Sequence, residues 1–159
     1  MIYLLSGEIE SGKSVALLDW AKARNDVYGV LTPRGDNAER FILDVQTKEV
    51  FRMEADPWEE DVIEVGRYVF LKSAFSKANA ILEKAIETSA KGYVIVDELG
   101  KLELRSEGLD TSARKVIEMT RKNDELHSIL IIRTSLLSEI LKKYEITNYT
   151  LISRENLPV

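Results

Sequence analysis

The residues with the clearest chemistry lie near the N-terminus. Gly7 and the run Gly12-Lys13-Ser14 have the spacing G-x-x-x-x-G-K-[ST]. Glycines at such positions let the backbone curl until its N–H groups point inward at a polyphosphate. Lys13 would supply a positive charge to the β- and γ-phosphates, and the Ser14 hydroxyl is a ligand for Mg²⁺. We therefore expect a nucleotide-phosphate site, with Lys13 also taking part in catalysis. Its residues are Gly7, Glu8, Ile9, Glu10, Ser11, Gly12, Lys13, Ser14 and Val15.

An acidic pair, Asp97-Glu98, follows the apolar run at residues 93–96. Open α/β sheets bind ligands at the carboxyl ends of their strands, so we expect Asp97 to complete the Mg²⁺ site with Ser14, through a metal-bound water. Glu98 would point the other way, and would orient and deprotonate a water that attacks the γ-phosphate. That arrangement is typical of a hydrolase, because a simple kinase would need an acceptor site there instead.

Phosphoryl transfer also calls for an arginine, because negative charge builds on the transferring oxygens. Arg34 follows the second apolar run and would lie at the correct edge of the sheet, so we predict that it is catalytic. Arg133 ends a later apolar run and is a weaker candidate for the same task.

The elements that must position these residues alternate along the chain. Apolar runs predict strands at 2–5, 27–31, 68–71, 93–96, 128–133 and about 148–152. Helical periodicity predicts helices at 13–24, at 75–86, at about 109–124 and at 135–143. The alternation predicts a three-layer α/β sandwich with a mostly parallel central sheet.

Two segments depart from that alternation. Residues 39–53 alternate between apolar and polar side chains, which predicts an antiparallel β-hairpin added to the sheet. Residues 54–61 are acidic and irregular, and we expect a solvated loop, the alternative being a lid over a substrate.

Composition limits the classes of protein that fit. The 159 residues suit one domain, 1–159, and 45% of them are hydrophobic. The formal net charge of -5 argues against nucleic-acid binding, which requires many phosphates to be neutralised. There are no cysteines, which excludes disulfides and thiolate chemistry. The sequence has neither a leader pattern nor a run long enough to cross a bilayer, so we expect a soluble cytoplasmic protein with no membrane contact.

Residues 97–104, Asp-Glu-Leu-Gly-Lys-Leu-Glu-Leu, resemble the D-E-I-G-K-M-E-L signature of the small P-loop nucleoside-triphosphatases. This family was first described in thermophiles and has an animal branch called cancer-related nucleoside-triphosphatase. Residues 29–32 resemble its G-F-x-T segment, residues 65–69 resemble its V-G-x-Y-x-V segment, and the likeness covers nearly the whole chain. The resemblance implies a RecA-like fold and slow Mg²⁺-dependent hydrolysis of ATP, GTP and other nucleotides.

The resemblance also implies roles for single residues. Lys101 would contact phosphate or Glu98, and so be catalytic. Residues 152–158 resemble the family's T-x-E-N-R segment, which implies that Asn156, or Arg154 beside it, contacts the base. The family's usual phosphate loop is G-P-P-G-V-G-K-T, whereas Glu8 and Glu10 bring negative charge into this one. We therefore expect weaker nucleotide binding, with the site retained.

Two other functions fit the same residues. A small nucleotide or metabolite kinase would hold its acceptor under residues 54–67. A nucleotide-dependent switch or assembly factor would use slow hydrolysis as a timer for a protein partner that the sequence does not identify. A nucleic-acid motor is a more distant fourth interpretation. Whatever the function, we expect a monomer or a weak oligomer.

Overall fold

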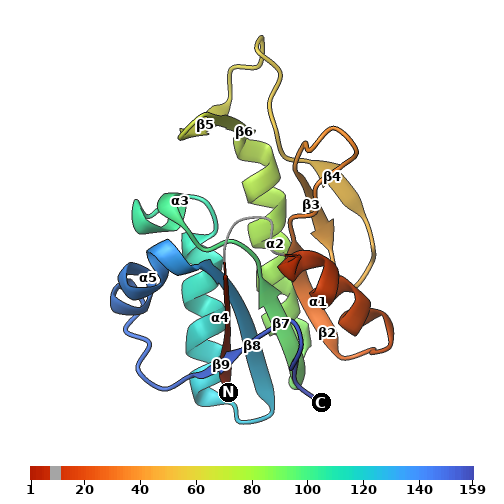
Figure 1. Ribbon diagram of the computed structural model, residues 1–159, viewed down its shortest axis with the longest axis vertical. Coiled ribbons are helices and arrows are strands. Elements are labelled where there is room, and N and C mark those ends of the chain that lie inside the picture. Colours follow the sequence, from red (N-terminus) through yellow and green to blue (C-terminus); the bar gives the residue numbers. More distant parts are fainter. Residues whose placement is uncertain (8–11) are drawn as a thin grey trace.

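The apolar runs form a seven-stranded sheet in the computed structural model, which describes residues 1–7 and 12–159 (Figure 1). The strand order is β4-β3-β2-β7-β8-β1-β9. The bounds are β1 Ile2–Gly7, β2 Val27–Leu31, β3 Phe41–Asp44, β4 Val50–Arg52, β7 Gly92–Val96, β8 Leu126–Arg133 and β9 Thr150–Ile152. Five strands pair in parallel, and the β3–β4 hairpin joins β2 in antiparallel fashion. The predicted mostly parallel sheet with an antiparallel hairpin is confirmed.

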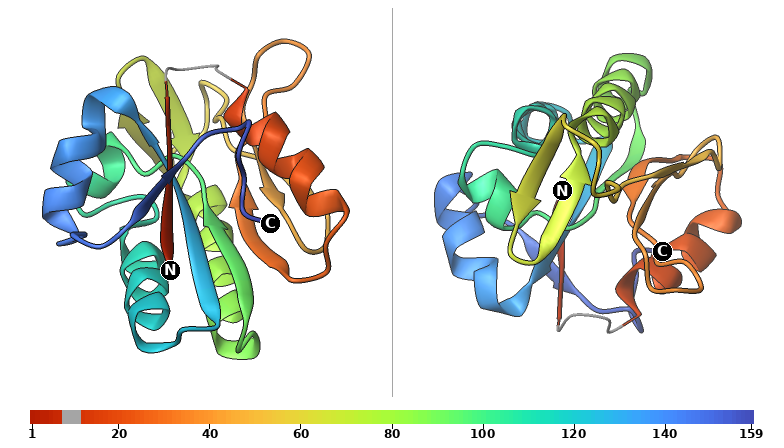
Figure 2. Two further views of the ribbon diagram at one scale, coloured as in Figure 1. Left: turned by 60° about the horizontal axis from the view of Figure 1, so that its bottom comes forward. Right: turned by 90° about the horizontal axis from the view of Figure 1, so that it is seen from above.

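Helices cover both faces of this sheet (Figure 2). They are α1 Lys13–Lys22, α2 Lys72–Thr88, α3 Lys101–Leu104, α4 Asp110–Lys122 and α5 Leu137–Lys143. On β7, Val94 and Val96 pack on the side of α2 and α4, whereas Tyr93 and Ile95 pack on the side of α1. Burial on both faces explains why the central strands are continuous apolar runs. The three-layer sandwich is therefore confirmed.

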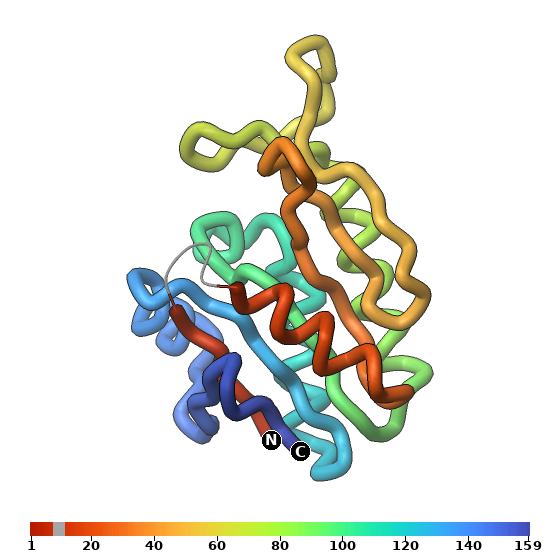
Figure 3. Tube along the Cα trace, turned by 45° about the vertical axis from the view of Figure 1, so that its right-hand side comes forward, coloured from red at the N-terminus to blue at the C-terminus, as the bar shows by residue number. Residues whose placement is uncertain are grey.

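The first and last strands lie side by side at one edge of the sheet. β9 pairs in parallel with β1 (Figure 3). Beyond it, the carbonyl oxygen of Pro158 accepts a hydrogen bond of 2.8 Å from Trp20 Nε1 on α1. The C-terminal segment is therefore held against the helix that follows the phosphate loop.

A second sheet was not predicted. β5 Val62–Val65 and β6 Tyr68–Leu71 form a separate antiparallel hairpin above the carboxyl edge of the main sheet (Figure 1). The predicted strand at 68–71 is correct, but β5 is flanked by the acidic residues 59–61, which concealed it. Residues 54–61 run as a loop into β5, as expected, apart from an isolated bridge between Glu54 and Phe70.

Other boundaries differ by one to three residues from the predicted ones, as element ends do when they fray. α1 ends at Lys22, β8 begins at Leu126, and a 3₁₀ turn at Thr134–Leu136 precedes α5. The short helix α3 was missed, because four residues carry too little periodicity to be recognised. Within the described residues, no helix combines the length and the apolar character needed to cross a membrane.

Candidate functional site

The predicted phosphate loop lies between a strand and a helix. β1 ends at Gly7 and α1 begins at Lys13, while residues 8–11 (Glu8, Ile9, Glu10 and Ser11) lie outside the described part of the chain. Gly12 has φ 81°, a left-handed conformation that favours glycine, and a Cβ there would lie 2.9 Å from Arg154 Nη1. The backbone therefore requires glycine at position 12, and the C-terminal loop approaches the phosphate loop closely.

Asp97 is the centre of a buried hydrogen-bond cluster, and its side chain is only 1% exposed. Its Oδ2 accepts hydrogen bonds from Ser14 Oγ at 2.8 Å, from the Thr32 backbone N–H at 2.9 Å and from Thr32 Oγ1 at 3.1 Å. β7, which delivers Asp97, lies beside β2, which delivers Thr32. The two predicted metal ligands, Ser14 and Asp97, are therefore in direct contact.

The electrostatics of Asp97 suit a cation. Burial, with a smaller effect from the charge of Glu98, raises the pKa of Asp97 to about 6. Its other oxygen, Oδ1, is buried and has no hydrogen-bond partner among the described residues. Carboxylate and hydroxyl oxygens are the ligands that Mg²⁺ uses, usually one or two of them with substrate phosphates. Asp97 and Ser14 thus fit Mg²⁺.

Glu98 adopts a left-handed backbone conformation, with φ 52°. Such a conformation is rare for a residue other than glycine and costs on the order of 1–3 kcal/mol. Its Oε2 accepts a charged hydrogen bond from Arg40 Nη1. Arg40 is only 4% exposed, whereas the Glu98 side chain is 33% exposed. Glu98 is therefore held by a buried guanidinium while part of it remains accessible.

The sequence analysis did not single out Arg40, the buried partner of Glu98. It comes immediately before β3, which pairs with β2, and β2 pairs in turn with β7, the strand that leads to Glu98. The signal in the sequence was a charged residue directly before a strand. That strand begins at the sheet edge where the other candidate residues lie. Arg34 lies in the same loop and forms a β-bridge with Arg40.

Arginines gather around Tyr68 on β6. The Arg40 guanidinium carbon lies 4.9 Å from the ring centroid, and that of Arg67 lies 5.2 Å from it. Hydrogen bonds from Arg67 and then from Arg34 lower the pKa of the Tyr68 hydroxyl to about 8. Arg34 also donates from Nη1 to the Ala38 carbonyl at 3.1 Å. The structure places Arg34 beside Tyr68, and its catalytic role remains a prediction.

This cluster predicts an unusual tyrosine titration. We expect one phenolate to form near pH 8, well below the ordinary value of about 10, in ultraviolet absorbance measured against pH. Because the folded-state pKa is lowered, the stability contributed by Tyr68 is full above pH 10 and is lost as the pH falls through 8. Tyr68→Phe should remove the early step, and Arg67→Gln should move it to higher pH. An early step that persists in Tyr68→Phe would contradict the assignment.

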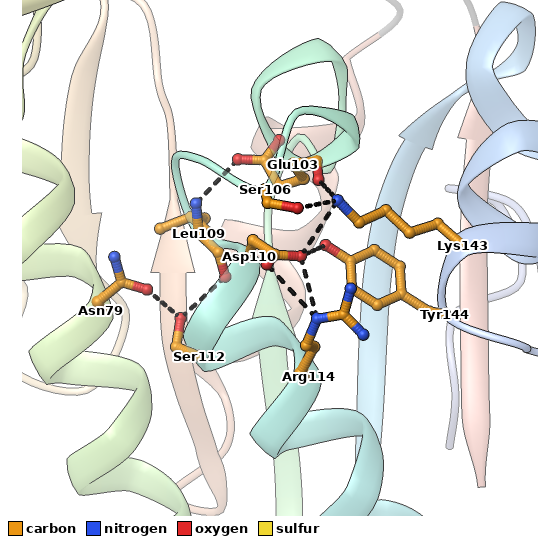
Figure 4. A network of polar contacts seen from close by, with 9 residues as sticks. All are labelled: Asn79, Glu103, Ser106, Leu109, Asp110, Ser112, Arg114, Lys143 and Tyr144. Atoms are coloured by element: carbon orange, nitrogen blue, oxygen red, sulfur yellow. Dashed lines mark hydrogen bonds and ion pairs between the residues drawn. The ribbon is translucent and has the colours of Figure 1, made fainter.

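The turn after Glu98 is fixed by Glu103. Its Oε1 accepts the Gly100 N–H at 2.7 Å, and its Oε2 accepts the Leu109 N–H at 2.9 Å. Burial raises the pKa of Glu103. Lys143 donates to the Glu103 carbonyl and, at 3.0 Å, to Ser106 Oγ (Figure 4). The second glutamate of the D-E-L-G-K-L-E-L segment therefore positions backbone that leads to the site.

The same network ties this turn to α4 and α5. Asp110 Oδ1 accepts a hydrogen bond of 2.7 Å from the Tyr144 hydroxyl, and Lys143 and Arg114 form ion pairs with the Asp110 carboxylate (Figure 4). Tyr144 is buried among the helices. The turn that carries Glu98 and Gly100 is thus braced from two helices.

Glu103→Gln should destabilise the fold. One oxygen of the carboxylate becomes an amide nitrogen that cannot accept, so a buried N–H of Gly100 or Leu109 loses its acceptor, at about 1–3 kcal/mol. Urea unfolding measures the change. Glu118→Gln, the same substitution at an exposed position of α4, should change stability by less than about 0.5 kcal/mol. Equal stability of the two variants would show that Glu103 does not brace the turn.

The remaining predicted residues spread around the same edge. Lys101 begins α3 and Arg133 ends β8, and both line a cavity that Asp97 and Glu98 also line. Asn156 Oδ1 accepts from Ser153 N at 2.7 Å and from Ser153 Oγ at 3.0 Å, which closes the C-terminal loop.

On the first helix, Val15 is 65% exposed. Of the described residues of the predicted phosphate loop, the structure brings Ser14 into contact with Asp97. It places Asn156 in the turn that carries Arg154.

Comparison with known proteins bears on the family and on the fold. A family described as NTPase matches residues 2–158. The chain belongs to this family. Among solved structures, THEP1 from the hyperthermophile Aquifex aeolicus superposes on this NTPase-family chain with a TM-score of 0.76 and 19% sequence identity, covering 96% of this chain and 89% of that chain. That likeness shows the fold. With the family match, it confirms the predicted membership of the small P-loop nucleoside-triphosphatase family. No curated protein matches significantly.

Proposed function

We propose that this chain is an Mg²⁺-dependent nucleoside-triphosphatase that converts ATP, GTP and similar nucleotides to the diphosphate and phosphate. The observation that carries the proposal is the pairing of two contacts at one sheet edge. Ser14 donates to Asp97 at 2.8 Å, and the next residue, Glu98, is held by the buried Arg40. The Ser14–Asp97 contact suits a metal site, and the Arg40–Glu98 contact suits a base that activates a water.

The binding roles follow from position. The loop backbone from Gly7 to Val15 would cradle the phosphates, and Lys13 would contact the β- and γ-phosphates. Ser14 and Asp97 would hold Mg²⁺, which when bound neutralises charge on the β- and γ-oxygens. Arg154, beside Gly12, and Asn156 in the same loop are the candidates for contact with the base or ribose.

The chemical roles fall to the acidic and basic side chains around Glu98. Its carboxylate accepts the proton of the attacking water as the new oxygen–phosphorus bond forms and the bond to the β-phosphate oxygen breaks. Arg40 holds that carboxylate in place, since Nη1 donates to Oε2. Lys101, Arg34 and Arg40 supply positive charge at the edge where the transferring oxygens gain charge.

The setting that we propose is the cytoplasm, with a monomer or weak oligomer as the working form. The absence of cysteine and the net charge of -5 support that setting.

Phosphate release tests the proposal. Purified protein with Mg²⁺ and one nucleotide at a time should release phosphate from ATP and GTP without any added acceptor, and EDTA should abolish the release. A kinase would consume nucleotide only when an acceptor is added. A switch would show negligible turnover until a partner accelerates it. Either of those two results would overturn the proposed hydrolase.

A further inference from the structure

A cavity of about 270 Å³ lies between the β5–β6 hairpin, helix α2 and the carboxyl edge of the main sheet. Its volume is close to the lower end of small-molecule sites, which is about 300 Å³. Most of its wall is apolar. That part includes Met53, Val65, Phe70, Phe75, Leu99 and Leu102. The wall is therefore suited to a hydrocarbon or aromatic body.

The cavity is distinct from the predicted phosphate loop. The cavity is not lined by the described residues of that loop, which include Gly7, Gly12, Lys13 and Ser14. It is lined by the acidic pair Asp97 and Glu98. The two sites thus meet at the acidic pair.

A buried guanidinium lies in the wall of this cavity. Arg40 lines it, is 4% exposed, and uses Nη1 for Glu98. Its Nε and Nη2 are buried and have no hydrogen-bond partner among the described residues. A buried N–H left without an acceptor is destabilising. The Nε–Nη2 edge is a planar fork that matches two oxygens of a carboxylate or a phosphate.

The charge around the cavity favours an anion. Arg40, Arg67, Lys101 and Arg133 all line it. The acidic residues of the wall are already engaged. Asp97 is bound by Ser14 and Thr32, Glu98 by Arg40, and Glu103 by the Gly100 and Leu109 backbone. The wall therefore carries four basic side chains against three acidic ones, a formal excess of one positive charge.

We propose that this cavity is a second ligand site, for a small molecule with an apolar body and a terminal carboxylate or phosphate that accepts from the Nε–Nη2 edge of Arg40. Binding at this site does not depend on hydrolysis. Its effect on turnover rests on the proposed function, because an occupant beside Glu98 limits the access of water and slows phosphate release.

Three probes with one body test the site by isothermal titration calorimetry on the full chain: 4-phenylbutyrate, 4-phenylbutyl phosphate and the neutral 4-phenylbutan-1-ol. We expect both anions to bind at least tenfold more tightly than the alcohol, and the tighter anion identifies the preferred head group. Equal binding of all three would overturn the role of Arg40. No binding by any probe would overturn the site.

Variants locate the binding. Arg40→Lys keeps a charge for Glu98 but lacks the fork, so the preference for the anions should fall below about threefold while the alcohol binds as before. Ala78→Leu, which fills the wall from α2, should weaken all three probes at least tenfold. Ala80→Leu, at an exposed position of the same helix, should leave them unchanged. If Ala78→Leu does not fold, the probe series on the native chain and on Arg40→Lys still tests the site.

Lys13→Ala separates the two sites. It should abolish nucleotide binding and leave probe binding within twofold. Loss of both would place the probes on the phosphate loop and overturn the proposal. Retained probe binding with no hydrolysis in the native chain would overturn the proposed function alone.

Discussion

Glu98→Gln should lower the turnover number by about 10²–10⁴-fold, the usual contribution of a positioned general base. Glutamine has nearly the same shape but cannot take the proton of the attacking water. Nucleotide affinity in the presence of Mg²⁺ should stay within a few-fold of the native value, because the phosphate loop and Asp97 are untouched. Single-turnover phosphate release measures the first quantity, and equilibrium binding of a fluorescent nucleotide measures the second.

The same substitution removes the carboxylate partner of Arg40, so it should also lower stability. Rates must therefore be divided by the folded fraction, determined by circular dichroism. Glu118→Gln, on the exposed face of α4, is the matched control and should keep native turnover. Normal turnover in Glu98→Gln would show that Glu98 takes no part in the chemical step.

Asp97→Asn should raise the Mg²⁺ concentration that gives half-maximal hydrolysis by at least tenfold. Asp97 Oδ2 accepts three hydrogen bonds, two of them from Thr32, so an asparagine must keep its oxygen toward these donors. The amide nitrogen then replaces Oδ1, and it cannot accept the hydrogen bond that a metal-bound water donates. Magnesium titrations of phosphate release measure the shift.

Ser14→Ala is the companion variant. It removes the other predicted ligand and should shift the magnesium dependence in the same direction. If the two substitutions act through one ion, the double variant should be little worse than the poorer single one. An unchanged magnesium dependence in Asp97→Asn would place the metal elsewhere.

The contact between Ser14 and Asp97 was predictable because it rests on local pattern and on one rule of topology. Parallel strands bring their carboxyl ends to one edge of the sheet, so Ser14, just after β1, and Asp97, just after β7, meet although 83 positions separate them. The same rule applies to Thr32, which follows β2. It would also have predicted the contact between Thr32 and Asp97.

Arg40 was not predictable in that way. Its contact with Glu98 spans 58 positions and depends on the β3–β4 hairpin joining β2 in antiparallel fashion, which sequence periodicity alone does not specify. The cavity depends in addition on the β5–β6 hairpin, of which only one strand was predicted. Arg34 was chosen because it follows the second apolar run and would lie at the ligand edge of the sheet, whereas the fold places Arg40 against the Glu98 carboxylate.

The signature segment shows how a motif mixes two kinds of residue. Asp97 and Glu98 face the reaction in the proposed mechanism, whereas Glu103 accepts two backbone N–H groups and fixes the turn between them. The sequence alone does not distinguish the reacting residues from the bracing one, because all three are acidic. Hydrogen bonding separates them: both carboxylate oxygens of Glu103 accept backbone N–H groups, whereas Asp97 Oδ1 has no partner among the described residues and the Glu98 side chain is one-third exposed.

The most direct test of the central claim is single-turnover hydrolysis of ATP in water enriched in ¹⁸O, with Mg²⁺ and no acceptor. Attack by water held at Glu98 predicts one labelled oxygen in each phosphate released, one phosphate for each ADP formed, and loss of both products in Glu98→Gln. ADP without phosphate, or a rate that Glu98→Gln leaves unchanged, would contradict it.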